Sequence, residues 1–177
     1  MPITTDLATT EPSALSSPLE RVMHQVLAMK QAGDMDHLIR EVWDVLVALD
    51  FDFVSCAFLL MEEERDWLTS YNVWEEVQVA ELYGATALSP HARRLENGLI
   101  IFSGQTPLHK APALYDDAIA AWRQGTVERH PLSATEIGEI IRLNTQRYGG
   151  PSARVYPIRF HLHIPFAYGV FTLRSRH

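Results

Sequence analysis

The spacing of hydrophobic positions predicts two amphipathic helices in the N-terminal part of the chain. In the segment 18–31, apolar residues recur every three or four positions, which places them on one side of a helix. The segment 36–49 repeats this spacing, with Leu38, Val42 and Leu49 on its apolar side. Both segments are therefore expected to pack against a sheet, against each other or against a second copy of the chain.

Three strands are predicted in the next part of the chain. The segment 53–61 is apolar on both of its alternating faces, which is typical of a central strand covered on both sides. A charged turn follows, and the segment 67–73 then alternates, so the two segments read as an antiparallel hairpin. The segment 98–103 is predicted as a short buried strand ended by Gly104 and Pro107, whereas 74–97 shows no clear period.

The C-terminal half is predicted to hold two helices and three strands. A helix is expected over 113–123 and a short strand over 126–130. Ser133 and Glu136 have the spacing of a capping box, in which each side chain bonds the backbone of the other at a helix start. The segment 153–175 reads as two strands joined by a tight connection, a buried C-terminal hairpin.

The order of these elements indicates the fold class. Helices fall between runs of strands and do not alternate strictly with them, which favours an α+β fold with an antiparallel sheet and helices packed on its faces. Residues 1–17 are rich in Thr, Ser, Pro and Ala and are expected to form a disordered tail. Residues 18–177 are expected to form a single domain.

Composition narrows the classes of function. The formal net charge is −7, and an acidic chain gains nothing from neutralising phosphates, so no nucleic-acid partner is expected. No apolar run approaches the roughly 18 residues of a membrane span, and the N-terminus lacks the pattern of a secretory signal. Cys56 is the single cysteine, which excludes an intrachain disulfide and fits a cytoplasmic protein.

Three stretches carry a family resemblance. They are the helix 38–52 running into F-V-S-C-A-F-L-L-M-E-E-E-R, the segment A-I-A-A-W-R-Q-G-T-V-E-R at 118–129, and L-H-I-P-F-A-Y-G-V-F-T-L-R-S at 162–175. In this order they resemble a GAF domain of bacterial signal-transduction sensors, a regulatory fold related to PAS. The chain departs from the family pattern after the last strand, where a closing helix is usual and only Arg174 to His177 remain.

The resemblance implies an input module that binds a small molecule or dimerises. Such modules are normally joined to a kinase, cyclase, phosphatase or transcriptional output, so a fused or partner output domain is expected, and the module itself is not an enzyme. Three known activities of the family are disfavoured. The cyclic-nucleotide pattern is missing, Cys56 lies in the wrong region for bilin attachment, and one cysteine does not suffice for methionine sulfoxide reduction.

The candidate binding residues begin with a pair of histidines. His161 and His163 lie two apart on a predicted strand and so project from one face, with Arg159 beside them. The opposite face of the strand is expected to point to the core; it carries Phe160, Leu162 and Ile164. Two imidazoles can hold a metal if further ligands, such as His109, His130 or an acidic residue, converge on it.

Aromatic and basic residues elsewhere complete the expected pocket. Trp67 and Tyr71 share a strand face and can line a cavity or simply pack across strands. Trp122 can stack on a ligand or belong to the core, and Arg123 can pair with an anionic group. Cys56, in an apolar strand, is expected to be an inert buried thiol. The acidic pair Asp116-Asp117 and the run 62–64 are interpreted as solvated turns and helix starts.

The sequence thus favours a GAF-type sensory domain that binds an unidentified small molecule between the sheet and the loops of residues 75–130. Its N-terminal helices are expected to pair in a homodimer, and no cofactor can be assigned. One alternative is a metal-dependent enzyme that uses His161 and His163, and another is a ligand-free scaffold for protein interaction. The phosphate-binding, dinucleotide-binding, nucleophile-elbow and H-E-x-x-H motifs are missing from the sequence.

Overall fold

The computed structural model describes residues 34–83, 92–148 and 157–177. The chain divides into two units, Met1–Phe51 and Asp52–His177. The predicted tail over 1–17 and the predicted helix over 18–31 lie outside the described residues.

In the first unit, the second predicted helix is present as α2, Met35–Ala48. Its apolar residues recur at helical spacing, and Asp36 lies in the first turn, where a carboxylate interacts favourably with the helix dipole. The helix ends at Leu49, whose amide donates to Val45 O at 3.0 Å, and Asp50 then takes a positive φ of 53°. A left-handed residue in this position cannot continue the helix.

The second unit is built on a seven-stranded sheet in which all neighbouring strands pair antiparallel, in the order β3-β4-β2-β1-β7-β6-β5. The strands are β1 Ser55–Glu62, β2 Trp67–Glu75, β3 Ala92–Arg94, β4 Leu99–Pro107, β5 Glu128–Pro131, β6 Phe160–Phe166 and β7 Gly169–Ser175. The central place of β1 confirms the prediction made from its two apolar faces. The buried C-terminal hairpin is also present, as β6 and β7.

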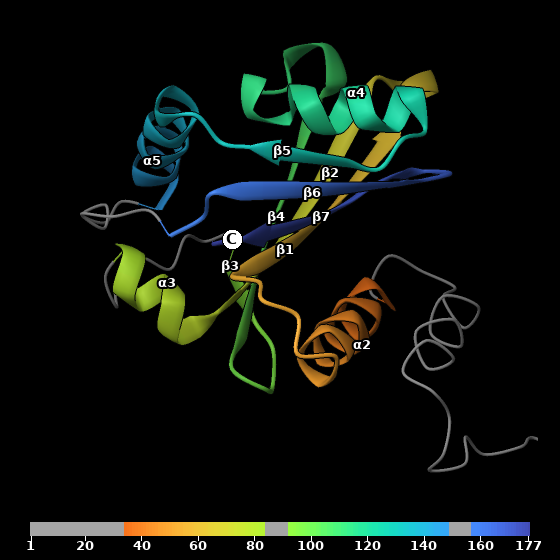
Figure 1. Ribbon diagram of the computed structural model, residues 1–177. Coiled ribbons are helices and arrows are strands. Elements are labelled where there is room, and N and C mark those ends of the chain that lie inside the picture. The colour runs from red at the N-terminus through yellow and green to blue at the C-terminus, as the bar shows by residue number, and fades with distance from the viewer. Residues whose placement is uncertain (1–33, 84–91, 149–156) are drawn as a thin grey trace, which may run out of the picture. The chain divides into compact units, whose positions relative to one another are not determined.

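Helices α3 Glu76–Tyr83, α4 Asp116–Gln124 and α5 Ala134–Tyr148 complete this unit. Helix α4 packs on β6 and β7, and in Figure 1 α5 lies beyond one end of β5. This arrangement confirms the predicted α+β class, an antiparallel sheet with helices packed on its faces, and is consistent with a GAF/PAS-like fold.

Two apolar clusters form the core on the side of the sheet that α4 covers. Leu59 and Met61 of β1 pack with Ala118 and Ile119 of α4 in one cluster. The other cluster joins Trp74, Ile100 and Phe102 of the sheet to Ile140 of α5. Leu114, in the 3₁₀ turn η4 (Ala113–Tyr115) before α4, packs against both clusters. The two helices therefore cover neighbouring parts of one sheet face.

Two sequence predictions about strands were wrong. The strand predicted over 98–103 extends further as β4, through Gly104 to Pro107, because β2 pairs with it along its whole length. In β6, His161 and His163 lie on the core face, with 5% and 2% of their surface exposed, while the alternate residues Phe160, Leu162 and Ile164 are only half-buried. The reason is that α4 packs on β6 and β7 over the histidine face.

Candidate functional site

The sheet face beneath the helices carries a band of buried polar side chains. His161 and His163 of β6 lie opposite Arg174 and Thr172 of β7 in the strand register, and Arg174 lies opposite Ser55 of β1. Strand alternation turns all five toward the core. Such burial costs free energy unless the polar atoms form hydrogen bonds.

Arg174 is the cation at the centre of this band and has only 8% of its surface exposed. Its Nη2 donates to Asn72 Oδ1 at 2.7 Å, and its Nη1 lies 3.4 Å from Ser55 Oγ. Among the ion pairs formed by the described residues, none includes Arg174. A buried positive charge therefore lies beside the two histidines.

Burial and this charge keep both imidazoles neutral. The pKa of His161 is lowered from 6.5 to about 2, mainly by burial and to a smaller extent by the charges of Arg174, His163 and His130. The pKa of His163 is lowered to about 4, mainly by burial and to a smaller extent by the charges of Arg174 and His130. His163 Nδ1 lies 3.0 Å from Thr172 Oγ1, but the buried Nε2 atom of each histidine has no hydrogen-bond partner within the described part of the chain.

One of these orphan nitrogens belongs to a residue that lines a pocket between α4 and α5. The pocket has a volume of about 190 Å³, and His161 of β6 forms part of its lining. Its apolar wall comes from Ala113, Leu114, Leu132 and Ile140, and its polar wall comes from Thr135, Asp117, Glu136 and Glu139. A site that is mostly apolar with a few converging polar groups is the usual form of a small-molecule pocket.

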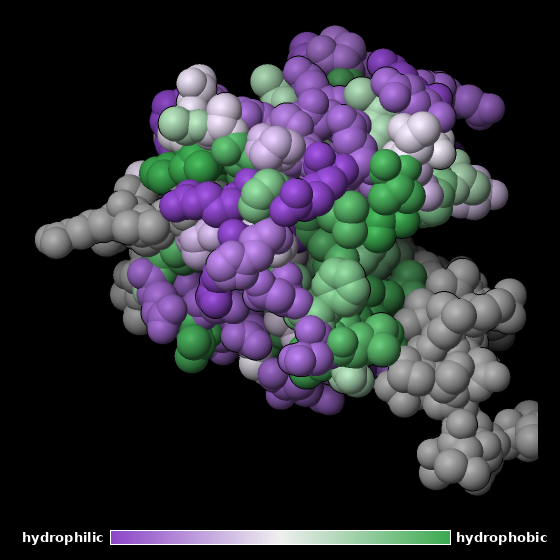
Figure 2. All heavy atoms as spheres, viewed as in Figure 1, coloured by the Kyte–Doolittle hydropathy of each residue, from purple (hydrophilic) through white to green (hydrophobic). Residues whose placement is uncertain are grey.

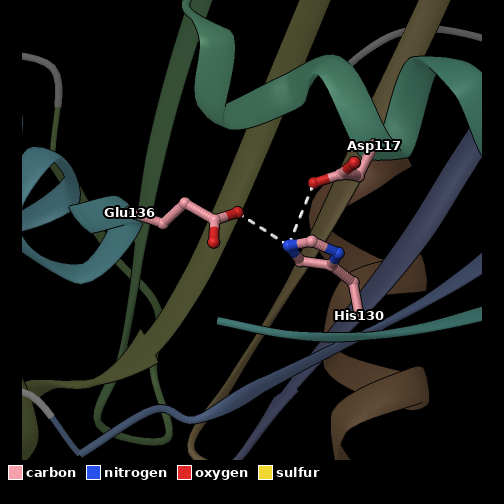
Figure 3. A group of neighbouring side chains, drawn as sticks. All are labelled: Asp117, His130 and Glu136. Carbon is pink, nitrogen blue, oxygen red and sulfur yellow. Dashed lines mark hydrogen bonds and ion pairs between the residues drawn. The ribbon is translucent and has the colours of Figure 1, made fainter. Parts of the chain in front are cut away.

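At the polar wall, three side chains from three consecutive elements converge. Figure 3 shows Asp117 of α4 and Glu136 of α5 pointing from two sides at the imidazole of His130 on β5. His130 Nε2 lies 3.1 Å from Asp117 Oδ2 and 2.7 Å from Glu136 Oε1. All three residues are partly buried, and their ligand atoms lie within 4.8 Å of one another. In the view of Figure 2, hydrophilic residues gather over β5, the strand that carries His130.

The capping box fixes the position of Glu136. The Ser133 amide donates to Glu136 Oε2 at 2.8 Å, and the Glu136 amide donates to Ser133 Oγ at 3.3 Å, as predicted. The hydrogen bond from the Ser133 hydroxyl is the largest of several effects that lower the pKa of Glu136 to about 2. Glu136 is therefore ionised at neutral pH, with Oε2 engaged at the helix start and Oε1 turned to His130.

The structure separates most of the residues predicted to bind a ligand. Trp67 and Tyr71 pair with Glu62 and Phe58 of β1, on the sheet face opposite to the histidines. Trp122 packs, half-buried, against the α4 cluster, which agrees with the core alternative. The exposed Arg123 pairs with Glu63 at 3.5 Å, and Arg159 is exposed. Of the seven predicted residues, only His161 and His163 lie together, with ring centroids 5.6 Å apart.

Asp117 and Glu136 were not predicted as site residues. Asp117 stands in the first turn of α4, as expected for an acidic helix start, but it is partly buried against His130. The capping-box spacing explains the presence of Glu136 without any ligand, so nothing in the sequence indicates its contact with His130. The sequence indicated His130 only as a further ligand of a metal held by His161 and His163. Cys56 is fully buried, which raises its pKa to about 12 and agrees with an inert thiol.

Comparison with known proteins adds no relative. The chain matches no family model, and no curated protein or solved structure shows significant similarity to it. Within 34–83, 92–148 and 157–177, no helix combines the length and the apolar character needed to cross a membrane.

Proposed function

We propose that the unit Asp52–His177 is a regulatory sensory module of the GAF type that acts in the cytoplasm and binds a small molecule between α4 and α5. The observation that carries this proposal is the pocket that contains His161, a buried residue with an orphan Nε2. A polar atom left without a partner in the core costs stability, and a ligand that hydrogen-bonds to it would remove that cost.

The walls of the pocket define the chemistry of this ligand. Asp117, Glu136 and Glu139 line it with carboxylates, while most of the remaining surface is apolar. Neutral His161 can donate to or accept from a ligand atom. The proposed ligand therefore has a compact apolar body and a basic or hydrogen-bond-donating end that faces the carboxylates.

Binding would tie α4 to α5, since each helix supplies part of the wall. We propose that this restraint is the signal and that an output domain of the kinase, cyclase or phosphatase class, fused or separate, receives it. The resemblance in sequence supports this assignment, and the fold is compatible with it.

Homodimerisation through the N-terminal helices is the second part of the proposal. The end of α2 and the residues after it expose Val47, Leu49 and Phe51, with 58%, 59% and 50% of their surfaces accessible, and such residues favour association. Sedimentation of the full chain is expected to show a dimer that weakens when residues 1–32 are deleted. The same monomer with and without these residues would remove this part of the proposal.

The pocket can be tested with short aliphatic amines in a buffer that contains a metal chelator. We expect amines with a compact hydrocarbon body to shift the amide resonances of Asp117, Leu132 and Ile140. At a concentration about ten times the dissociation constant they should raise the melting temperature by about 3 °C. The reason is that a ligand bound only to the folded state stabilises it by mass action.

A variant that fills the pocket supplies the control. Ala113 is exposed at the pocket wall, so Ala113→Phe is expected to block the amines without disturbing the core. Val127 is also exposed but does not line the pocket, so Val127→Phe should leave binding unchanged. Equal binding by both variants, or no shift with any amine, would contradict the proposed pocket.

A further inference from the structure

The cluster of Asp117, His130 and Glu136 has the donor atoms of a metal site. Two carboxylate oxygens face one imidazole nitrogen, at 3.1 and 2.7 Å. Two carboxylates this close repel each other, and a positive charge held between them would offset the repulsion. A cation that accepts an electron pair from each of the three atoms supplies that charge.

The distances suit a small divalent ion. Metal–ligand bonds of about 2.0–2.2 Å to histidine nitrogen and carboxylate oxygen place neighbouring donor atoms roughly 3 to 3.5 Å apart. The two contacts of His130 are close to this spacing, and the three donor atoms already lie within 4.8 Å of one another. Small rotations of the two carboxylates would complete the geometry.

A second observation points to a ligand at the same place. His161 lies opposite His130 in the β5–β6 register and lines the pocket together with Asp117 and Glu136. Only 5% of its surface is exposed, and its buried Nε2 has no partner among the described residues. A nitrogen in this position can accept a hydrogen bond from water bound to a metal, which would satisfy it.

We infer that Asp117, His130 and Glu136 bind a divalent first-row transition metal ion, such as zinc, at the polar wall of the pocket. The inference rests on the proposed function only in sharing that pocket. One imidazole and two carboxylates suit such an ion better than calcium or magnesium, which prefer oxygen donors alone. The three ligands come from α4, β5 and α5, so the ion joins the elements that enclose the pocket.

Zinc titration of the full chain, first stripped with a chelator and then freed of it, tests the inference. Calorimetry is expected to show one zinc ion per chain with a dissociation constant in the micromolar range. The visible spectrum of the cobalt form should report coordination by nitrogen and oxygen. His130→Gln and Asp117→Asn are each expected to weaken zinc binding by at least about tenfold, since each removes a ligand atom or its charge.

His109 supplies the matched control, because its Nδ1 pairs with Asp66 on an exposed surface and the pair is not part of the convergent cluster. His109→Gln should bind zinc as the wild type does. Asp117→Asn keeps the size of the side chain, so it decides the matter if His130→Gln does not fold. Absence of zinc binding by the wild type, or wild-type affinity in Asp117→Asn, would overturn the metal site. Amine binding in chelator would stand in either case.

Discussion

Replacing Gly169 by alanine is expected to lower the free energy of unfolding by about 3 kcal/mol, because the added methyl group meets backbone that cannot move aside. A Cβ atom at this position would lie 1.9 Å from Leu59 O and 2.9 Å from the carbonyl carbon of Leu59. Gly169 opens β7 and lies opposite Leu60 of the central strand β1. The substitution must therefore shift the hairpin away from the centre of the sheet.

Gly138→Ala is the matched control for this prediction. Gly138 lies inside α5, and nothing lies within 4 Å of the position its Cβ would take. Alanine loses less backbone entropy than glycine in a helix, so this variant should gain about 0.5–1 kcal/mol. Urea unfolding measures both changes. A Gly169→Ala variant within about 1 kcal/mol of the wild type would contradict the close approach of Gly169 to the backbone of Leu59.

Acid is expected to destabilise the second unit well above the pH at which carboxylates titrate. The folded-state pKa values of His161 and His163, about 2 and about 4, lie below the unfolded value of 6.5. Below pH 6.5 the unfolded chain binds protons that the folded chain does not. The contribution of these histidines to the free energy of unfolding is therefore fully present above pH 6.5. Below this pH the free energy of unfolding falls by about 1.4 kcal/mol per pH unit for each histidine.

The charged groups that face these histidines either lower the histidine pKa values further or titrate only at lower pH. Arg174 on β7 and His130 on β5 both disfavour a further positive charge. Asp117 and Glu136 line the pocket beside His161, and the pKa of Glu136, about 2, adds acid sensitivity only below its unfolded value of 4.5. The interval between pH 6.5 and about 4.5 therefore isolates the contribution of the histidines.

Urea unfolding in chelator at about pH 7 and about pH 5 measures this effect, and a loss of about 2 kcal/mol per histidine is expected. His163→Gln retains an amide that can reach Thr172 but does not titrate, so it should remove about half of the pH dependence. His177→Gln, at a position whose side chain is 86% exposed, should leave the pH dependence as it is. A free energy of unfolding that stays constant over this interval would contradict the buried, neutral state of both residues.

The fold could be predicted largely from local patterns. The two apolar faces of β1, the capping box of Ser133 and Glu136, and the C-terminal hairpin each depend on neighbours in sequence, and the structure confirms all three. The buried face of β6 could not be inferred in this way. Its apolar residues Phe160, Leu162 and Ile164 predicted the wrong face, because α4, which is distant in sequence, covers the histidine face instead.

The candidate site was harder to predict from the sequence, because its residues meet through contacts between elements that are distant in sequence. Strand periodicity correctly placed His161 and His163 side by side, but it could not show that Trp67 and Tyr71 belong to the opposite sheet face. Asp117 meets His130 only because α4 lies over β5, and no spacing along the chain encodes that contact. The sequence therefore identified His161 and His163, whereas the contact between Asp117 and His130 became visible only in the structure.

The position of β1 at the centre of the sheet has a consequence for how the protein is made. One of its neighbours, β2, follows it directly in sequence, but the other, β7, includes Arg174, which lies 119 residues after its partner Ser55. At translation rates of about 5–20 residues per second, β1 waits roughly 6–24 s on the ribosome before β7 is synthesised. Until then, one edge of its backbone has no strand to pair with, so the central strand of the finished sheet is the exposed edge of the nascent one.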